Sequence, residues 1–294
     1  MEQELGLIGL GNAGLALAAP ILKKYSIIGF DLDPARCALA ADMGVKVVAS
    51  ARALAQRCEI ILLSLPNPAI SKSVLEAIGA DALAKRTVVE TSTVTPEDIE
   101  ALLAIAAPAG ASIVESAIIG GVHKLAAGEG TFLVAAAEQD YRRVEPILQA
   151  AAEKIFFLGP LGNAMRAKLV CNGVAHAVMV VIIEAAALAA AQNVPLDVFY
   201  ELMRRDSGLM RPLTHRFGER ILKQDFEGGM STTNARKDSA LILDAARDLG
   251  VPLFAISGAH NVYEIAMREG LEKQDYAAIS KLWEKWMGVS FAAK

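Results

Sequence analysis

Two polar residues, Lys168 and Asn172, lie near the start of a stretch, residues 162–192, that has one internal glycine and no proline. Residues four apart share one face of a helix, so an ammonium group and a side-chain amide are predicted side by side. Such an amine can give a proton to a substrate oxygen or take one from it, while the amide holds the geometry. The pair therefore predicts a site for proton transfer to or from a substrate oxygen. The alternative is a lysine that extends to solvent, as most do.

The stretch itself reads as one long helix of roughly 42 Å. Its middle is apolar on all sides, which is typical of a buried helix. Glu184 interrupts the apolar run and is expected to bond a partner within the helical part of the protein. One small helical domain cannot cover such a helix completely, so we expect a homodimer or a homotetramer.

Composition limits the remaining function classes. The chain has 294 residues, 54% of them hydrophobic, and a formal net charge of -4. This charge gives no attraction to nucleic acid or to acidic membranes. The three cysteines show no metal-ligand spacing, so we expect a reducing compartment and no metal site. The apolar run at residues 5–22 is broken by glycines, and the long helix carries polar residues, so the sequence predicts a cytoplasmic protein without a membrane span.

The first half of the chain alternates strand-like and helix-like segments. The predicted strands are residues 5–10, 26–31, 59–65, 87–91 and 112–115. The predicted helices are residues 12–24, 34–42, 68–78 and 96–107, three of which have a proline near the first turn. Residues 131–136, 140–151 and 154–158 add a strand, a helix and a strand at the edge. The pattern predicts an α/β domain with a parallel, doubly wound sheet.

The strand pattern stops near residue 160. The sequence then reads as helical to its end, with breaks at prolines and glycines. We therefore predict a Rossmann-type dinucleotide-binding domain at residues 1–160 and an all-α domain for substrate binding and oligomerisation at residues 161–294, joined by the long helix.

A glycine motif follows the first predicted strand and opens the first predicted helix. It consists of Gly9, Leu10, Gly11, Asn12, Ala13 and Gly14. In a dinucleotide site the first glycine permits a tight turn, the second lets a pyrophosphate approach the main chain, and the third allows close helix packing. The helix N-terminus then offers free N–H groups to the phosphates. The motif and its context predict dinucleotide binding.

The residue at the end of the second predicted strand selects the dinucleotide. Asp31 lies twenty residues after Gly11, where a carboxylate accepts hydrogen bonds from the adenosine ribose and repels a 2′-phosphate. Arg36 is a nearby cation that could reverse this preference, but we expect it to face solvent. The sequence favours NAD over NADP.

Further motifs follow in a fixed order along the chain. They are Ser64-Leu65-Pro66; Glu90-Thr91-Ser92-Thr93 with Pro96; Gly162 through Lys168 to Asn172; and Lys237-Asp238. With the glycine motif they make the chain resemble the β-hydroxyacid dehydrogenase family, which includes 3-hydroxyisobutyrate dehydrogenase and tartronate semialdehyde and glyoxylate reductases. The resemblance implies that Lys168 and Asn172 are catalytic. It also implies cofactor contacts at Leu65, Pro66, Thr93 and Lys237, and substrate contacts at Ser92 and Asp238.

The substrate motif of this family departs from its usual form here. Residues 115–121 read Glu-Ser-Ala-Ile-Ile-Gly-Gly, and Ile119 replaces a serine that would bind the substrate carboxylate. Gly120 and Gly121 remain, so their N–H groups can still hold an anion. We therefore expect a small-molecule substrate with a more apolar contact at Ile119.

Three functions remain open. The leading one is an NAD-dependent oxidoreductase that interconverts a small β-hydroxy acid and its semialdehyde or oxo acid. An imine or bulky-ketone reductase is suggested by Ile119 but disfavoured by the retained Lys168. A non-catalytic dinucleotide-binding regulator predicts loss of Lys168 or Asn172, and neither is lost.

Overall fold

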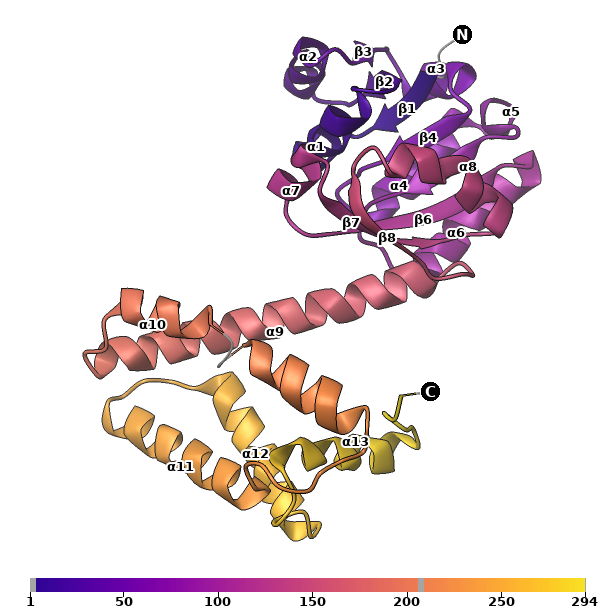
Figure 1. Ribbon diagram of the computed structural model, residues 1–294. Helices are drawn as coiled ribbons and strands as arrows, with labels where there is room; N and C mark the ends of the chain where they lie inside the picture. Colours follow the sequence, from indigo (N-terminus) through magenta and orange to yellow (C-terminus); the bar gives the residue numbers. More distant parts are fainter. Residues whose placement is uncertain (1–3, 206–208, 294) are drawn as a thin grey trace. The chain divides into compact units, whose positions relative to one another are not determined.

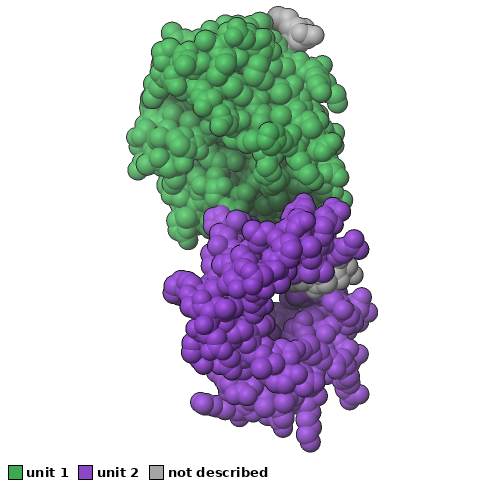
Figure 2. Space-filling model, turned by 90° about the vertical axis from the view of Figure 1, so that its left-hand side faces the viewer, with its two compact units in different colours: residues 1–173 green, residues 174–294 purple. Residues whose placement is uncertain are grey.

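The computed structural model describes residues 4–205 and 209–293. The chain divides into two compact units, Met1–Gly173 and Val174–Lys294, which Figure 2 colours separately. The division falls inside helix α9 (Asn163–Ala191), so the first turns of this helix belong to the first unit and the rest to the second.

An eight-stranded sheet forms the centre of the first unit (Figure 1). The strands are β1 (Glu4–Ile8), β2 (Ser26–Phe30), β3 (Lys46–Val47), β4 (Ile60–Leu63), β5 (Thr87–Glu90), β6 (Ser112–Ile119), β7 (Gly130–Ala135) and β8 (Ala152–Phe157). Their spatial order is β3-β2-β1-β4-β5-β6-β7-β8. Neighbouring strands are parallel except β6 and β7, which are antiparallel. The chain order changes direction at β1 and β4, which is where ligands bind in sheets of this kind.

Helices cover both faces of this sheet. They are α1 (Asn12–Ile21), α2 (Pro34–Asp42), α3 (Ala51–Arg57), α4 (Pro68–Ile78), α5 (Ala80–Leu83), α6 (Pro96–Ala106), the 3₁₀ turn η1 (Ala107–Ala109), α7 (Val122–Ala127) and α8 (Glu138–Leu148). Helices α2, α4 and α6 begin at a proline, as predicted. The preceding Asp33, Asn67 and Thr95 side chains each accept a hydrogen bond from a first-turn N–H group.

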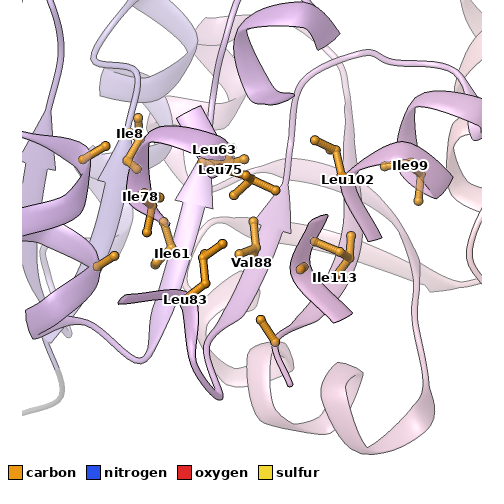
Figure 3. Close-up of a cluster of buried hydrophobic side chains, with 14 of the residues drawn as sticks. Ile8, Ile61, Leu63, Leu75, Ile78, Leu83, Val88, Ile99, Leu102 and Ile113 are labelled. Atoms are coloured by element: carbon orange, nitrogen blue, oxygen red, sulfur yellow. The ribbon is translucent and has the colours of Figure 1, made fainter. Parts of the chain in front are cut away.

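Alternate residues of the strands enter two separate cores. On one face Ile61, Leu63 and Val88 pack against residues of α3 to α6, as Figure 3 shows. On the other face, Ile60 and Leu62 pack with residues of α1, α7 and α8. Strand residues alternate between faces, so a strand buried on both faces is apolar throughout. The predicted fold class, a doubly wound sheet followed by helices, is confirmed.

Several elements of the first unit differ from the sequence prediction. Strand β3 and helices α3, α5 and α7 were not predicted. Strand β3 has only two residues, both exposed, and α5 has only four, so neither gives a periodic signal. Strand β6 was expected to end at Glu115 but continues to Ile119, because pairing with β7 extends it. Part of the expected substrate loop is therefore strand.

The second unit contains helices throughout its described residues. They are the later part of α9, then α10 (Leu196–Met203), the π-helical segment η2 (Pro212–Ile221), α11 (Thr232–Asp248), α12 (Phe254–Arg268), the 3₁₀ turn η3 (Tyr276–Ile279) and α13 (Ser280–Met287). Glu184 of α9 is buried, and its carboxylate accepts hydrogen bonds from the N–H groups of Phe254, Ala255 and Ile256. The predicted partner of Glu184 is therefore the N-terminus of α12.

Helix α9 is a single long helix, as predicted (Figure 1). Its predicted burial is wrong for the single chain. Val170 is 69% exposed, Val174 61% and Ile183 55%. The helix is long and apolar enough to cross a membrane by length and composition, and only 6% of its most apolar window is buried. The other helices of the chain therefore leave most of the apolar surface of α9 exposed.

Candidate active site

The glycine motif forms a tight turn between β1 and α1. Gly9 has φ of 94°, and a Cβ atom there would lie 2.1 Å from the main-chain oxygen of Ser64. A Cβ atom on Gly14 would lie 2.0 Å from the main-chain oxygen of Gly9. At Gly11, by contrast, a Cβ atom would meet nothing within 4 Å. The turn is therefore closed beneath and open above Gly11, as a bound pyrophosphate requires.

A cavity of about 460 Å³ opens above this turn. Most of the predicted cofactor-binding residues line it: Gly9, Gly11, Asn12, Ala13, Gly14, Asp31, Leu65 and Pro66. The N-cap of α1 is Gly11, which has no side chain to cap the helix. Unpaired N–H groups at a helix N-terminus attract phosphate.

Asp31 is held in this cavity by two main-chain groups. Its carboxylate accepts hydrogen bonds from the N–H groups of Leu10, at 2.6 Å, and Asp33, at 2.9 Å. A carboxylate has about four acceptor sites, so capacity remains for ribose hydroxyls. Leu10 was predicted to bind the cofactor, but its side chain is fully buried in the core. Its contribution is the N–H group that orients Asp31.

Arg36 also lines this cavity, whereas it was expected to face solvent. Its Nη1 atom donates a hydrogen bond to Oδ1 of Asn12 at 3.0 Å. Asn12 is the first residue of α1, so the guanidinium group is tied close to the predicted phosphate site. The sequence could not show this, because the direction of a side chain on a short helix depends on how that helix packs.

A second cavity, of about 320 Å³, continues from the first, with which it shares Ala13, Ser64, Leu65 and Pro66. Four predicted site residues from separate segments line it: Ser92, Thr93, Gly120 and Gly121. The hydroxyl oxygen of Ser92 accepts a hydrogen bond from the N–H group of Leu65 at 2.8 Å. This contact joins the segments after β4 and β5 at the carboxyl edge of the sheet.

Lys168 lines neither cavity, but it contacts a residue that lines the second one. Its Nζ atom donates a hydrogen bond to the main-chain oxygen of Ile118 at 2.6 Å, and Ile118 lines that cavity. The side chain is partly buried, and this burial lowers the pKa of the amine, against a smaller opposing effect of Cys171. Asn172 is partly exposed, and in the described part of the chain no hydrogen bond joins it to Lys168.

Glu115 holds the start of α9. This buried carboxylate accepts hydrogen bonds from the N–H groups of Gly162 and, at 2.9 Å, Met165. Burial raises its pKa, and the N–H groups oppose that effect. No role was predicted for Glu115 from the sequence. The available signal was an acidic residue in a strand that is apolar except for two serines.

Three predicted residues of the first unit, Ile119, Lys168 and Asn172, line neither cavity. Ile119 packs against the apolar cluster on the α9 side of β6. Lys237 and Asp238 lie on α11 in the second unit, where they form an exposed ion pair at 3.1 Å. Their roles toward cofactor and substrate stay predictions. Among the described residues no group of three or more potential metal ligands is found.

The open space above Gly11, the uncapped N-terminus of α1 and the oriented Asp31 carboxylate together fit a dinucleotide. Residues 4–159 match the family model described as the NAD-binding domain of 6-phosphogluconate dehydrogenase. Residues 162–283 match the model described as NAD-binding of NADP-dependent 3-hydroxyisobutyrate dehydrogenase. The chain belongs to the β-hydroxyacid dehydrogenase family. It is an NAD-dependent dehydrogenase acting on hydroxyl groups, so the non-catalytic alternative is wrong.

Relatives match this family member over nearly its full length. The 2-(hydroxymethyl)glutarate dehydrogenase of Eubacterium barkeri is 28% identical over 291 residues, which are 98% of this chain and 97% of the relative. The mitochondrial 3-hydroxyisobutyrate dehydrogenase of Drosophila melanogaster is 28% identical over 292 residues, 96% of this chain and 90% of the relative. A solved imine reductase from Pseudomonas sp. shares the fold, with a TM-score of 0.87 at 20% identity over 96% of this chain and 99% of that one.

Proposed function

We propose that this dehydrogenase interconverts a small β-hydroxy acid and the corresponding semialdehyde or oxo acid, with Lys168 as the general acid and base. The observation that carries the proposal is the hydrogen bond, 2.6 Å long, between Lys168 and Ile118, which lines the second cavity. That cavity adjoins the one that fits the dinucleotide. An amine beside the expected reaction centre can exchange a proton with the substrate oxygen.

In this proposal the first cavity binds the dinucleotide. The N–H groups at the start of α1 would bind the pyrophosphate, and Asp31 would bind the adenosine ribose. Thr93 would lie along the nicotinamide part. When bound, NAD takes up or supplies the hydride at the substrate carbon.

Lys168 moves the proton at the substrate oxygen. In the direction of reduction its ammonium form donates a proton to the developing alkoxide, and in the direction of oxidation its neutral form removes the hydroxyl proton. Partial burial lowers the pKa of this amine below its ordinary value, which eases release of its proton. Asn172, one turn further along α9, would hold the substrate oxygen. Lys237 and Asp238 would complete the site from the second unit.

The substrate class follows from the second cavity and from the relatives. Gly120 and Gly121 line the cavity and offer main-chain N–H groups to a carboxylate, with Ser92 beside them. The named relatives act on 2-(hydroxymethyl)glutarate and 3-hydroxyisobutyrate, which are both hydroxy acids. Ile119 replaces the serine hydroxyl expected at the acid, so the substrate would be less polar at that point.

A panel of substrates tests this proposal. NADH oxidation is followed with semialdehydes, 2-oxo acids, ketones and imines, and NAD reduction with the matching hydroxy acids. Turnover of a carboxylate-bearing semialdehyde or oxo acid supports the proposal. Turnover of imines or bulky ketones alone would favour the second candidate, which Ile119 suggests and which the retained Lys168 disfavours.

We also propose that the enzyme is a cytoplasmic homodimer or homotetramer in which α9 packs against another copy. The support is the exposed apolar surface of α9. In this arrangement residues 1–160 bind the dinucleotide and residues 161–294 bind substrate and form the oligomer. Light scattering without detergent at micromolar concentration tests it, and a monomer there would contradict it.

A further inference from the structure

Glu115 is an acidic residue in an unusual place. It lies on β6 and is fully buried, and the neighbours on its side of the strand, Ile113 and Ala117, are apolar core residues. Burying a carboxylate is costly unless hydrogen bonds replace its water. Here the replacements are the N–H groups of Gly162 and Met165. The carboxylate therefore fastens the beginning of α9 to the middle of β6.

A second contact links the same two segments. Lys168 follows Met165 by three residues on α9, and Ile118 follows Glu115 by three residues on β6. Lys168 donates its hydrogen bond to the Ile118 oxygen at 2.6 Å. Both contacts therefore join β6 to α9. The first is made by an acidic side chain of the strand, and the second by a basic side chain of the helix. Because Ile118 lines the second cavity, this pair of contacts sets where the amine lies relative to that cavity.

We propose that Glu115 is a positioning residue for Lys168: its carboxylate fixes the first turn of α9 so that the amine stays in contact with Ile118, which lines the second cavity. Glu115 itself lines neither cavity and does not touch substrate in this proposal. The inference rests on the proposed function for its consequence in catalysis. Loss of the carboxylate displaces the proton donor without disturbing the dinucleotide site, so it slows turnover and leaves dinucleotide binding unchanged.

Two variants of Glu115 and one matched control test this. In Glu115→Gln an amide replaces one acceptor oxygen and turns an NH₂ group toward an N–H donor. Glu115→Asp keeps both acceptors on a shorter side chain and should restore part of the effect. Glu184→Gln is the control, because Glu184 is also buried and also caps a helix, but that helix is α12 in the second unit. Any general loss of stability should be similar in both Gln variants.

The kinetic measurement uses the best substrate of the panel. In Glu115→Gln we expect kcat to fall by about 10- to 100-fold, as a misplaced catalytic group does, while the Kd of NADH changes less than about twofold. The primary deuterium isotope effect with NADH deuterated at C4 should increase, because chemistry becomes more rate-limiting. Partial unfolding alone would lower kcat without changing this isotope effect. An unchanged kcat and isotope effect in Glu115→Gln, or equal changes in Glu184→Gln, would overturn the proposal.

A second readout does not depend on turnover. The lysines are ¹³C-methylated and titrated by NMR, which reports the pKa of Lys168 directly. Burial lowers this pKa in the wild type, so it should rise toward that of a lysine in water in Glu115→Gln and stay unchanged in Glu184→Gln. If the wild type turns over nothing in the panel, the proposed function fails. The titration then decides the positioning role alone, and an unmoved pKa would refute it.

Discussion

The Nζ atom of Lys168 lies 2.6 Å from the main-chain oxygen of Ile118, so a side chain from α9 reaches the end of β6 at the point where that strand borders the second cavity. This contact gives the amine a fixed place before any substrate arrives. A substrate oxygen that enters the cavity has to compete with a main-chain oxygen for the same donor. The proposed acid–base role of Lys168 leads to the first two of the following predictions.

Removal of the amine should abolish most of the activity. In Lys168→Ala we expect kcat to fall by about 10²- to 10⁴-fold, the usual contribution of general acid–base catalysis. NADH binding, measured by fluorescence titration, should be nearly unchanged, because Lys168 does not line the first cavity. Lys23→Ala, which removes an exposed lysine just after α1, is the control and should retain full activity. A fall in kcat of less than threefold in Lys168→Ala would remove the main support for the mechanism.

The pH dependence should have opposite signs in the two directions. Reduction needs the ammonium form of Lys168, so its kcat should fall as pH rises through the pKa of this amine. Oxidation needs the neutral form, so its kcat should rise through the same pKa. Because burial lowers that pKa, the midpoint should lie below 10.5, the ordinary value. Lys168→Arg should lose this titration, since arginine stays charged throughout the range. The same slope in both directions would contradict the assignment.

Cofactor preference should depend on Asp31 and Arg36 together. In Asp31→Asn the repulsion of a 2′-phosphate disappears, while Arg36 remains on the cavity wall. We expect the preference for NADH over NADPH to decrease by about tenfold, which corresponds to roughly 1.4 kcal/mol. The gain for NADPH should vanish in the double variant Asp31→Asn/Arg36→Ala. Equal changes in the Kd of NADH and NADPH would show that Asp31 does not distinguish a free ribose hydroxyl from a 2′-phosphate.

The cap of α12 should contribute to stability in a pH-dependent manner. Burial raises the pKa of Glu184, but its three hydrogen bonds from main-chain N–H groups outweigh this and lower it below the ordinary 4.5. A lowered pKa in the folded state means stability that is fully present above about pH 4.5 and lost as pH falls through the folded value. At pH 7 we expect Glu184→Gln to cost roughly 1–3 kcal/mol of unfolding free energy. Denaturant unfolding should show this difference shrinking at acid pH, and a constant difference would contradict the assignment.

The exposed surface of α9 should be an oligomer interface. Val170 and Val174 are four residues apart on this helix, and both are largely exposed. Val174→Glu would bury a charge in such an interface, so the oligomer seen by light scattering should dissociate. Val47→Glu alters an exposed valine on β3 and should leave the oligomer intact. If the oligomer stays intact in Val174→Glu as well as in Val47→Glu, the interface lies elsewhere.

Local sequence was sufficient where the structure depends on a few neighbouring residues. The roles of Gly9, Gly11 and Gly14 in the turn were predicted because a tight turn and a close approach each exclude a side chain in a known position. Helices α2, α4 and α6 begin at prolines for a similarly local reason. Asp31 reached the predicted cavity because a residue at the end of the second strand lies at the carboxyl edge of a parallel sheet.

Two kinds of feature could not be predicted from the sequence. One is the face of a strand to which a given residue points, and the other is contact between residues far apart in the chain. Strand alternation places Ile118, and not Ile119, along the second cavity, and this requires the true end of β6. Arg36 was expected in solvent because nothing local shows its contact with Asn12. The burial of α9 was overestimated. Apolar composition shows that a helix has an apolar surface, but it does not show whether other parts of the same chain pack against that surface.

Residue type and short spacing were enough to predict most of the longer strands and helices of the first unit, the dinucleotide turn and the lysine proposed for proton transfer. The place of that lysine could not be predicted in this way. Its position depends on Glu115 meeting Gly162 and on Ile118 meeting Lys168. Residues so far apart in the chain are brought together by the packing of α9 against β6, and no local preference specifies that packing.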